Sequence, residues 1–319
     1  MKIVFLGTGE IGIPSLKAIY DSSDHHIISV FTQPDKPFGR KGELKPSEIK
    51  KFAQSKNIPI YQPYKIREQE AIDQLSIRNP DVLVVVAYGQ ILPKAVLRIP
   101  KIACINLHAS LLPLYRGASP IQAAILNGNE QTGLTSMYIG EGLDDGDLLK
   151  SKELIIDQDE TGGSLHDRLA ALGPELLIES LNLLSIGQAP REEQDHDQAT
   201  HVSKLSRSDG EIDWSKSAES IERKIRAFDP WPGTFTYFPD GTQVKIFPPV
   251  SIEKNRDSEP GVIISTQSDY ITVRCGVGAM SFSLIQPAGR KKMSLSSYMA
   301  VSYTHLRAHE TLRYLVCRL

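Results

Sequence analysis

Two polar side chains near the end of an apolar stretch have the types and the spacing for chemistry on a carbonyl group. The run Ala103–Leu107 predicts a buried strand, and it places Asn106 and His108 two residues apart. Residues with this spacing in a strand point to the same side, so both groups are expected to face one ligand. The amide can stabilise an oxyanion, and the imidazole titrates near neutral pH and can move a proton. The alternative for His108 alone is a structural hydrogen bond at a strand end.

A carboxylate for this pair is offered by the sequence GLDDGD, Gly142–Asp147, which follows a second predicted strand. A carboxylate there can hold the imidazole of His108 and raise its pKa. The alternative is an acidic surface turn, because Asp and Gly are frequent in turns. The candidate groups come from two separate segments, so the fold must bring them together.

The elements that must position these groups follow from the first 190 or so residues, where apolar runs alternate with helical patterns. The expected strands are Lys2–Leu6, His26–Thr32, Ile58–Tyr61, Val82–Ala87, Ala103–Leu107 and Thr135–Ile139. The expected helices are Ile13–Tyr20, Glu48–Gln54, Glu68–Ile77, Lys94–Arg98, Pro120–Asn127 and a long helix that ends near Ser185. Such alternation is typical of an α/β fold with a Rossmann-like, doubly wound, mostly parallel sheet, which binds ligands at the carboxyl ends of its strands.

The second half of the chain has a different pattern. A polar stretch without apolar periodicity predicts a linker, and beyond it come one helix, Ala218–Phe228, and five short alternating runs separated by Pro, Gly and Asp. This pattern predicts a small antiparallel β-barrel of the OB-like kind. The expected organisation is a catalytic domain over 1–187, a linker over 188–203, the barrel over 204–299 and a tail over 300–319.

Composition limits the class of protein. The chain has 319 residues, 40% of them hydrophobic and 23% charged, with a net charge of -2, which is ordinary for a soluble globular protein. No apolar run approaches the ~20 residues that would span a bilayer, so a cytoplasmic protein is expected. The cysteines are odd in number and widely spaced, which argues against a disulfide framework and a zinc site.

The first turn matches a dinucleotide-binding pattern. GTGEIG, Gly7–Gly12, has the G-x-G-x-x-G spacing between a predicted strand and a predicted helix. NAD binding also needs an acidic residue at the end of the second strand, but Thr32 and Gln33 stand there, and Asp35 lies beyond a proline. We therefore expect the glycines to serve a tight turn and expect no NAD.

Two basic clusters lie far apart in the sequence. Basic residues outnumber acidic ones between Asp35 and Lys51, and Arg290, Lys291 and Lys292 form a second cluster. A solvated surface is the alternative for either cluster alone. Two basic patches on different domains can nevertheless line one phosphate-bearing ligand.

The string INLHASLLP, Ile105–Pro113, followed by GLDDGD, resembles the folate-dependent formyltransferases. The resemblance implies that Asn106, His108 and Asp144 form the catalytic centre, with 10-formyltetrahydrofolate as co-substrate and neither NAD nor a metal. It also implies contacts to the folate from two stretches, one next to the catalytic strand and one in AYGQIL. These residues are Ser110, Leu111, Leu112, Pro113, Gly89, Gln90, Ile91 and Leu92.

Three further segments resemble the members of this family that act on tRNA: the loop Val30–Lys50, RAFDPWPGTF at Arg226–Phe235, and QPAGRKKM at Gln286–Met293. The resemblance implies formyl transfer to methionine on initiator Met-tRNA; a monomer is expected. The side chains that would contact tRNA are Lys36, Arg40, Lys41, Lys45, Arg290, Lys291 and Lys292. The alternative is a formyltransferase for an amino group of a nucleotide sugar, against which the basic loop argues. From about Ala300 the chain departs from the family, so the tail is expected to be non-native and dispensable.

Overall fold

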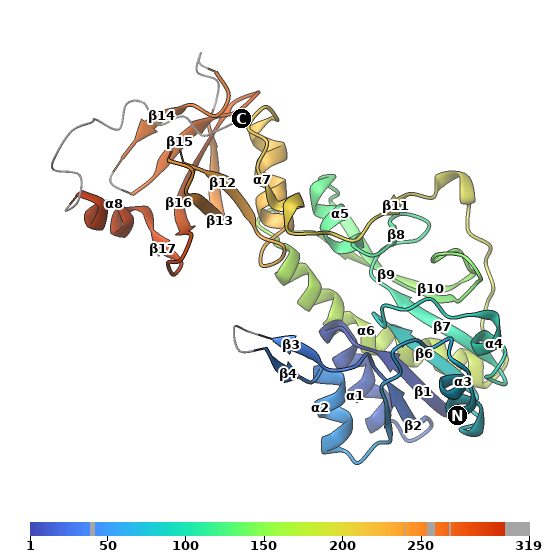
Figure 1. The fold of residues 1–319 in the computed structure, drawn as a ribbon. Coiled ribbons are helices and arrows are strands. Elements are labelled where there is room, and N and C mark those ends of the chain that lie inside the picture. The colour runs from blue at the N-terminus through green and yellow to red at the C-terminus, as the bar shows by residue number, and fades with distance from the viewer. Residues whose placement is uncertain (39–41, 239, 254–258, 268, 304–319) are drawn as a thin grey trace. The chain divides into compact units, whose positions relative to one another are not determined.

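A central sheet carries most of the first half of the chain (Figure 1). The computed structural model describes residues 1–38, 42–238, 240–253, 259–267 and 269–303. The sheet has seven strands in the order β10-β9-β7-β6-β1-β2-β5. Their bounds are β1 Lys2–Gly7, β2 His26–Phe31, β5 Ile60–Tyr61, β6 Val82–Val86, β7 Ala103–His108, β9 Gln131–Tyr138 and β10 Leu148–Ile155. The expected strands are present, with ends that differ by one or two residues, or by four at the start of β9.

The pairing departs from a parallel pattern at one edge. Strands β1, β2, β5, β6 and β7 run parallel, whereas β9 pairs antiparallel with β7 and β10 pairs antiparallel with β9. A parallel crossover needs a dozen or more residues and usually a helix, so the short connection 139–147 accounts for the antiparallel pairing of β10 with β9, although not for that of β9 with β7. Strand β10 was not predicted because its sequence, LLKSKELI, does not alternate between apolar and polar residues.

Helices cover both faces of this sheet. Residues of α3 and α4 share one apolar cluster with Val4, Leu83 and Cys104. On the other face α6 approaches Leu107, since a Cβ at Gly173 would lie 3.2 Å from that side chain. The helices are α1 Ile13–Asp21, α2 Glu48–Ser55, α3 Gln69–Ile77, α4 Lys94–Leu97 and α6 Gly162–Ser185. Because side chains alternate along a strand, Asn106 and His108 point to the same side as Cys104, just past the apolar cluster.

A second sheet is built by the carboxyl-terminal part of the chain. Its strands follow the order β12-β13-β16-β15-β14, with β17 paired to β16, and every pairing is antiparallel, as predicted. The elements are α7 Ala218–Ala227, β12 Thr234–Tyr237, β13 Gln243–Glu253, β14 Ile263–Thr266, β15 Ile271–Arg274, β16 Ala279–Pro287, β17 Met293–Ser294 and α8 Leu295–Tyr303. Within the described residues no ladder joins β12 to β14, so strand pairing leaves this path open rather than closing a barrel.

The core of this second sheet is apolar and continuous. Trp214, Val244, Val273 and Ile285 are buried in it, and α7 contributes buried residues to the same cluster. Ser217 caps α7 by accepting a hydrogen bond from the Ser220 backbone, which fixes where the helix begins. Leu295 at the start of α8 is fully buried. The expected tail begins inside α8, and residues 304–319 lie outside the described part of the chain.

The chain forms two compact units, each made of more than one segment. The first unit consists of residues 1–120, 131–155 and 166–203, and the second of 121–130, 156–165 and 204–319. Residues 188–203, the predicted linker, belong to the first unit. Helix α5, Pro120–Leu126, lies almost wholly in the second unit. No helix among the described residues is long and apolar enough to cross a membrane.

Candidate active site

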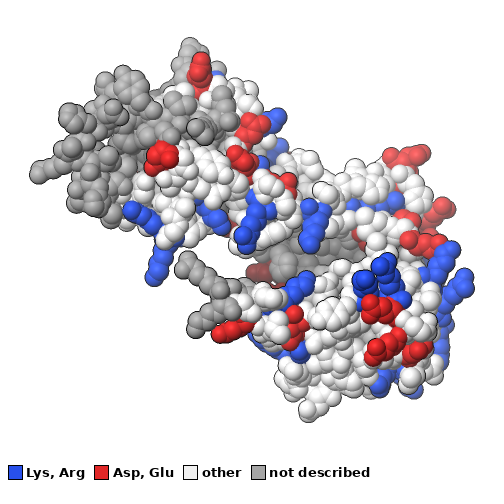
Figure 2. Space-filling view, viewed as in Figure 1, with Lys and Arg blue, Asp and Glu red and all other residues white. Residues whose placement is uncertain are grey.

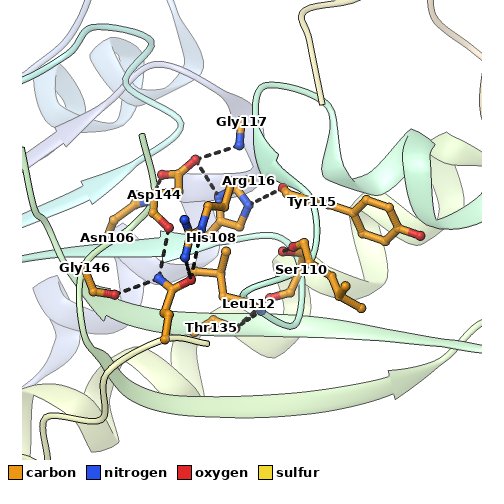
Figure 3. A network of polar contacts seen from close by, with 12 residues as sticks. Asn106, His108, Ser110, Leu112, Tyr115, Arg116, Gly117, Thr135, Asp144 and Gly146 are labelled. Carbon is orange, nitrogen blue, oxygen red and sulfur yellow. Dashed lines mark hydrogen bonds and ion pairs between the residues drawn. The ribbon is translucent and has the colours of Figure 1, made fainter. Parts of the chain in front are cut away.

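One carboxylate joins the amide and the imidazole that the sequence singled out (Figure 3). Asn106 Nδ2 lies 3.4 Å from Asp144 Oδ1, and His108 Nδ1 lies 3.6 Å from Asp144 Oδ2. The His108 and Asp144 side chains are 7% and 17% exposed. The expected meeting of these residues is therefore observed, although the loop that carries Asp144 follows the antiparallel strand β9.

His108 is held from its other side by the backbone. Its Nε2 lies 2.9 Å from the carbonyl oxygen of Tyr115. A carbonyl only accepts hydrogen bonds, so Nε2 carries a proton and donates it there. The separation of 3.6 Å between Nδ1 and Asp144 exceeds hydrogen-bond length, so this nitrogen has no short bond that locks it. The imidazole is fixed in orientation and still has one nitrogen for proton exchange.

Two residues beside the imidazole have left-handed backbone conformations. Asp144 has a φ of +50° and Tyr115 a φ of +60°, although neither is glycine. Such conformations persist only where the surroundings hold them, and they occur often at active sites. Asp144 Oδ2 accepts a hydrogen bond of 2.9 Å from the backbone N–H of Gly117. A Cβ at position 117 would lie 2.3 Å from the Val202 carbonyl oxygen, so this close approach requires glycine.

The stretch after β7 is held as a tight loop next to the catalytic pair. Ser110 donates a 2.6 Å hydrogen bond to the Leu114 carbonyl. Thr135 of β9 donates to the Ser110 carbonyl at 2.7 Å and accepts from the Leu112 backbone at 3.2 Å. The side chains of Ser110 and Leu112 are buried, whereas Leu111 and Pro113 are partly exposed. The structure brings this loop to His108, but its predicted contact with folate stays a prediction.

The second stretch expected to border the folate follows β6. Gln33 Nε2 donates a 2.9 Å hydrogen bond to the Tyr88 carbonyl, and Gln90 Oε1 accepts one of 2.7 Å from the Ile66 backbone. Within the described part of the chain, the backbone N–H groups of Gln90, Ile91 and Leu92 donate no hydrogen bond. The Ile91 side chain is 79% exposed. Unpaired N–H groups beside an exposed apolar side chain are suited to the polar edge and the face of a heterocycle.

The glycine-rich turn at the end of β1 packs tightly against β6. A Cβ at Gly9 would lie 3.0 Å from the Ala87 Cβ, and one at Gly7 would lie 2.5 Å from the Phe5 ring. The Gly9 backbone donates to the Ala87 carbonyl at 3.2 Å. These contacts explain the glycines by close packing, as expected, and the absence of NAD binding stays a prediction.

The basic loop after β2 contains a short hairpin of β3 Lys36–Phe38 and β4 Glu43–Lys45. Lys36 and Lys45 face each other across the hairpin and are exposed. Lys50 makes a 2.6 Å ion pair with Asp35 where the loop leaves the sheet. The hydrogen bonds from Lys50 and Gln62 hold the pKa of the Asp35 carboxyl below its usual range. Two further residues predicted to contact tRNA, Arg40 and Lys41, lie outside the described residues.

The second basic cluster lies in the second unit, between β16 and β17. Arg290, Lys291 and Lys292 are exposed. The Lys292 ammonium lies 4.2 Å from the centre of the Phe247 ring, and the Arg290 guanidinium lies 5.7 Å from that of Tyr298. Aromatic rings therefore hold two of these cations on the surface, where they stay accessible.

Sequence reasoning missed the side chains behind the catalytic loop. Gln194 is 3% exposed, and its Nε2 donates to the carbonyls of Asp144 at 3.0 Å and Gly146 at 2.7 Å. Arg116, 5% exposed, donates to Gln194 Oε1. Arg116 could have indicated a buried polar contact, because it is a charged residue that directly follows the apolar loop. Gln194 sits in a polar stretch that carries no comparable signal.

In the ranges that the structure describes, no group of three or more His, Cys, Asp or Glu side chains is arranged to hold a metal ion.

The chain matches two family models along its length. Residues 1–181 match the model described as "Formyl transferase", and residues 204–302 match "Formyl transferase, C-terminal domain". A relative from Marinobacter nauticus named methionyl-tRNA formyltransferase is 44% identical over 93% of this chain and 94% of its own length.

Solved structures of lower identity share the fold. HypX from Aquifex aeolicus in complex with tetrahydrofolic acid has a TM-score of 0.62 at 15% identity; the match covers 100% of this chain but 51% of HypX, so the chain spans about half of that protein. WlaRD, a sugar 3N-formyl transferase, has a TM-score of 0.64 at 18% identity, and the match covers 91% of this chain and 99% of WlaRD.

Proposed function

The chain belongs to the formyl transferase family in both parts of its length, and we propose that it transfers a formyl group from 10-formyltetrahydrofolate to the amino group of methionine on initiator tRNA. The observation that carries this proposal is the 44% identity to a methionyl-tRNA formyltransferase across nearly the whole chain. The contacts of Asn106, His108 and Asp144 supply groups that the reaction requires.

The first requirement is stabilisation of an oxyanion, because attack of the amine on the formyl carbon gives a tetrahedral intermediate. The Asn106 amide has two N–H groups, and its contact to Asp144 is long at 3.4 Å, so a donor remains for the intermediate. His108, when protonated, provides a second donor. A single donor of this kind typically contributes ~10²-fold or more to the rate.

The second requirement is proton transfer. A bond forms between the methionine nitrogen and the formyl carbon, and the bond between that carbon and N10 of the folate breaks. The proton lost by the amine must reach N10. We assign this transfer to His108 Nδ1, which is not locked by a short bond, with Asp144 balancing the positive charge of the imidazolium and keeping the ring in place.

The folate side of the site is assigned to the strip after β6 and the loop after β7. The N–H groups of Gln90, Ile91 and Leu92, which donate no hydrogen bond to any described residue, support this assignment, since a pterin presents a polar edge with several hydrogen-bonding groups. Gly89 and the loop from Ser110 to Pro113 complete the proposed binding residues. No step of this mechanism needs NAD or a metal.

The tRNA side is assigned to the basic residues. Figure 2 shows several lysine and arginine side chains on the surface of the second unit, and the cluster Arg290, Lys291 and Lys292 belongs to that unit. Lys36 and Lys45 on the hairpin, with Arg40 and Lys41 between them, would meet phosphates of the acceptor stem. We propose a monomeric enzyme in the cytoplasm, where translation initiation takes place.

The rival proposal is formyl transfer to an amino group of a nucleotide sugar. The shared fold of WlaRD at 18% identity does not favour it over the tRNA reaction, because so distant a likeness reports the fold alone. A formylation assay would offer initiator Met-tRNA, elongator Met-tRNA and a nucleotide-linked amino sugar to the purified chain with 10-formyltetrahydrofolate. We expect formylation of initiator Met-tRNA only. Formylation of the sugar amine with none on tRNA would contradict the proposal.

A further inference from the structure

The two residues beside His108 that have left-handed backbone conformations are both hydrogen-bonded by one segment that lies far away in the sequence. Asp144 and Tyr115 supply the oxygen atoms that face the two nitrogens of the imidazole, and both have left-handed backbone conformations. The Asp144 carbonyl accepts a hydrogen bond from Gln194, and the Tyr115 N–H donates one of 2.7 Å to Thr200 Oγ1. The contacts that hold both residues therefore come from residues 194–202.

The orientation of the Gln194 amide follows from the chemistry of its neighbours. Arg116 has only donors, and it lies 2.7 Å through Nη2 and 3.1 Å through Nε from Gln194 Oε1. The carbonyls of Asp144 and Gly146 only accept, so the Nε2 side must face them. Both hydrogens and the oxygen of this buried amide are thus in use. A saturated buried group of this kind fixes its partners, because any shift leaves a polar atom without a partner.

The carboxyl-terminal end of this segment pairs with the chain that follows Tyr115. Strand β11, His201–Val202, pairs in parallel with β8, Arg116–Gly117. The Arg116 N–H donates to the Thr200 carbonyl at 2.8 Å, next to the bond from Tyr115 to the Thr200 hydroxyl. This ladder also sets the Gly117 N–H that donates to Asp144.

We propose that residues 194–202 form a positioning element of the active site, in which Gln194 fixes the backbone at Asp144 and Thr200 fixes the backbone at Tyr115. The proposal rests on the proposed function, since it assumes that His108 and Asp144 act in formyl transfer. Neither Gln194 nor Thr200 needs to touch a substrate. Both act through the two oxygens that orient the imidazole.

The test uses Gln194→Glu in the full chain. Glutamate keeps an oxygen acceptor for Arg116 but has no hydrogens for the carbonyls of Asp144 and Gly146. The variant therefore removes the two bonds that position the Asp144 loop and leaves the contact with Arg116 in place. We expect kcat for initiator Met-tRNA to fall about tenfold to a hundredfold, as for a small misplacement of reacting groups, with KM for both substrates within about twofold. Gln188→Glu, the same change at an exposed residue before this segment, is the matched control and should leave kcat unchanged.

A double variant decides whether Gln194 acts through the carboxylate. In an Asp144→Asn background, Gln194→Glu should change kcat by less than about twofold, because the group that it positions is already impaired. A full additional loss in that background would overturn the inference, as would wild-type kcat in Gln194→Glu alone. Wild-type kcat in Asp144→Asn would instead contradict the role assigned to Asp144, whereas the absence of any formylation of initiator Met-tRNA by the wild-type chain would contradict the proposed function. If Gln194→Glu does not fold, Thr200→Val takes its place; an unchanged kcat there overturns the inference, and a several-fold loss supports it.

Discussion

The catalytic centre and the basic hairpin are built in opposite ways. The His108 side chain is 7% exposed, and each of its nitrogens faces an oxygen whose backbone is itself held. In the hairpin, the described side chains of β4 are exposed, and Lys50 and Gln62 hold Asp35 where the hairpin joins the sheet. The catalytic centre is therefore fixed by several contacts on each side of the imidazole, whereas the hairpin is held where it joins the sheet.

The difference matches what each region is proposed to do. Chemistry on a carbonyl needs donors within a few tenths of an ångström of their targets, so a buried network is required. Attraction of a polyanion acts over roughly 8 Å at physiological salt, so lysines on an exposed hairpin suffice. Variants in the two regions should therefore differ in the kinetic constant that they change and in their response to salt.

The largest effect is expected from the catalytic pair. Asn106→Ala and His108→Ala should each lower kcat by ~10²-fold or more, with KM for 10-formyltetrahydrofolate little changed, because both groups act mainly on the transition state. The loss should be the same at low and high salt. Steady-state formylation rates across a salt series measure this, and near wild-type turnover in either variant would remove these residues from the mechanism.

A smaller and selective effect is expected at Arg40, which lies outside the described residues. Arg40→Lys keeps the charge but loses the planar group that stacks on bases and binds phosphate through two nitrogens. We expect kcat/KM for initiator Met-tRNA to fall on the order of tenfold, as for one specific contact, with folate binding unchanged. Equal activity of wild type and Arg40→Lys would leave only the charge of the hairpin as evidence for tRNA.

The hairpin lysines should contribute a salt-dependent effect. Lys36→Ala and Lys45→Ala should raise KM for Met-tRNA about two- to threefold at low salt and reduce the salt slope of log KM by roughly one each. Lys17→Ala, at an exposed position of α1, is the control. If the control changes KM as much as the hairpin variants, the effect belongs to overall charge and the comparison of the two regions fails.

The smallest effect concerns the base of the hairpin. The Lys50 and Gln62 hydrogen bonds lower the pKa of Asp35, so its charged form stabilises the folded state. This contribution is complete above the unfolded pKa of about 3.9 and is lost as the pH falls through the folded value. The difference in urea midpoint between wild type and Asp35→Asn should therefore be constant from pH 7 to 5 and narrow below about pH 4. A difference that widens on acidification would reverse the assigned sign.

Sequence patterns predicted the catalytic groups better than their supports. Asn106 and His108 follow from alternation in one strand, which is a local property, and the structure places Asp144 beside them. The antiparallel pairing of β10 with β9 was missed because β10, LLKSKELI, lacks the alternation of apolar and polar residues by which a strand is recognised. Gln194 was missed for a different reason. Its burial is created by Arg116 and two carbonyls, so nothing in its own neighbourhood of the sequence distinguishes it from a solvated glutamine.

The parallel ladder between β8 and β11 has a consequence for protein engineering. A chain cut after residue 187 would retain every strand of the seven-stranded sheet and α6, yet it would lack the partner that the Arg116 and Tyr115 backbones use. A fragment meant to keep the Arg116 and Tyr115 backbones in place should therefore extend at least to Val202. Hybrids that join this sheet to a foreign carboxyl-terminal domain should place the junction after Ser203, since an earlier junction exchanges part of the catalytic machinery together with the domain.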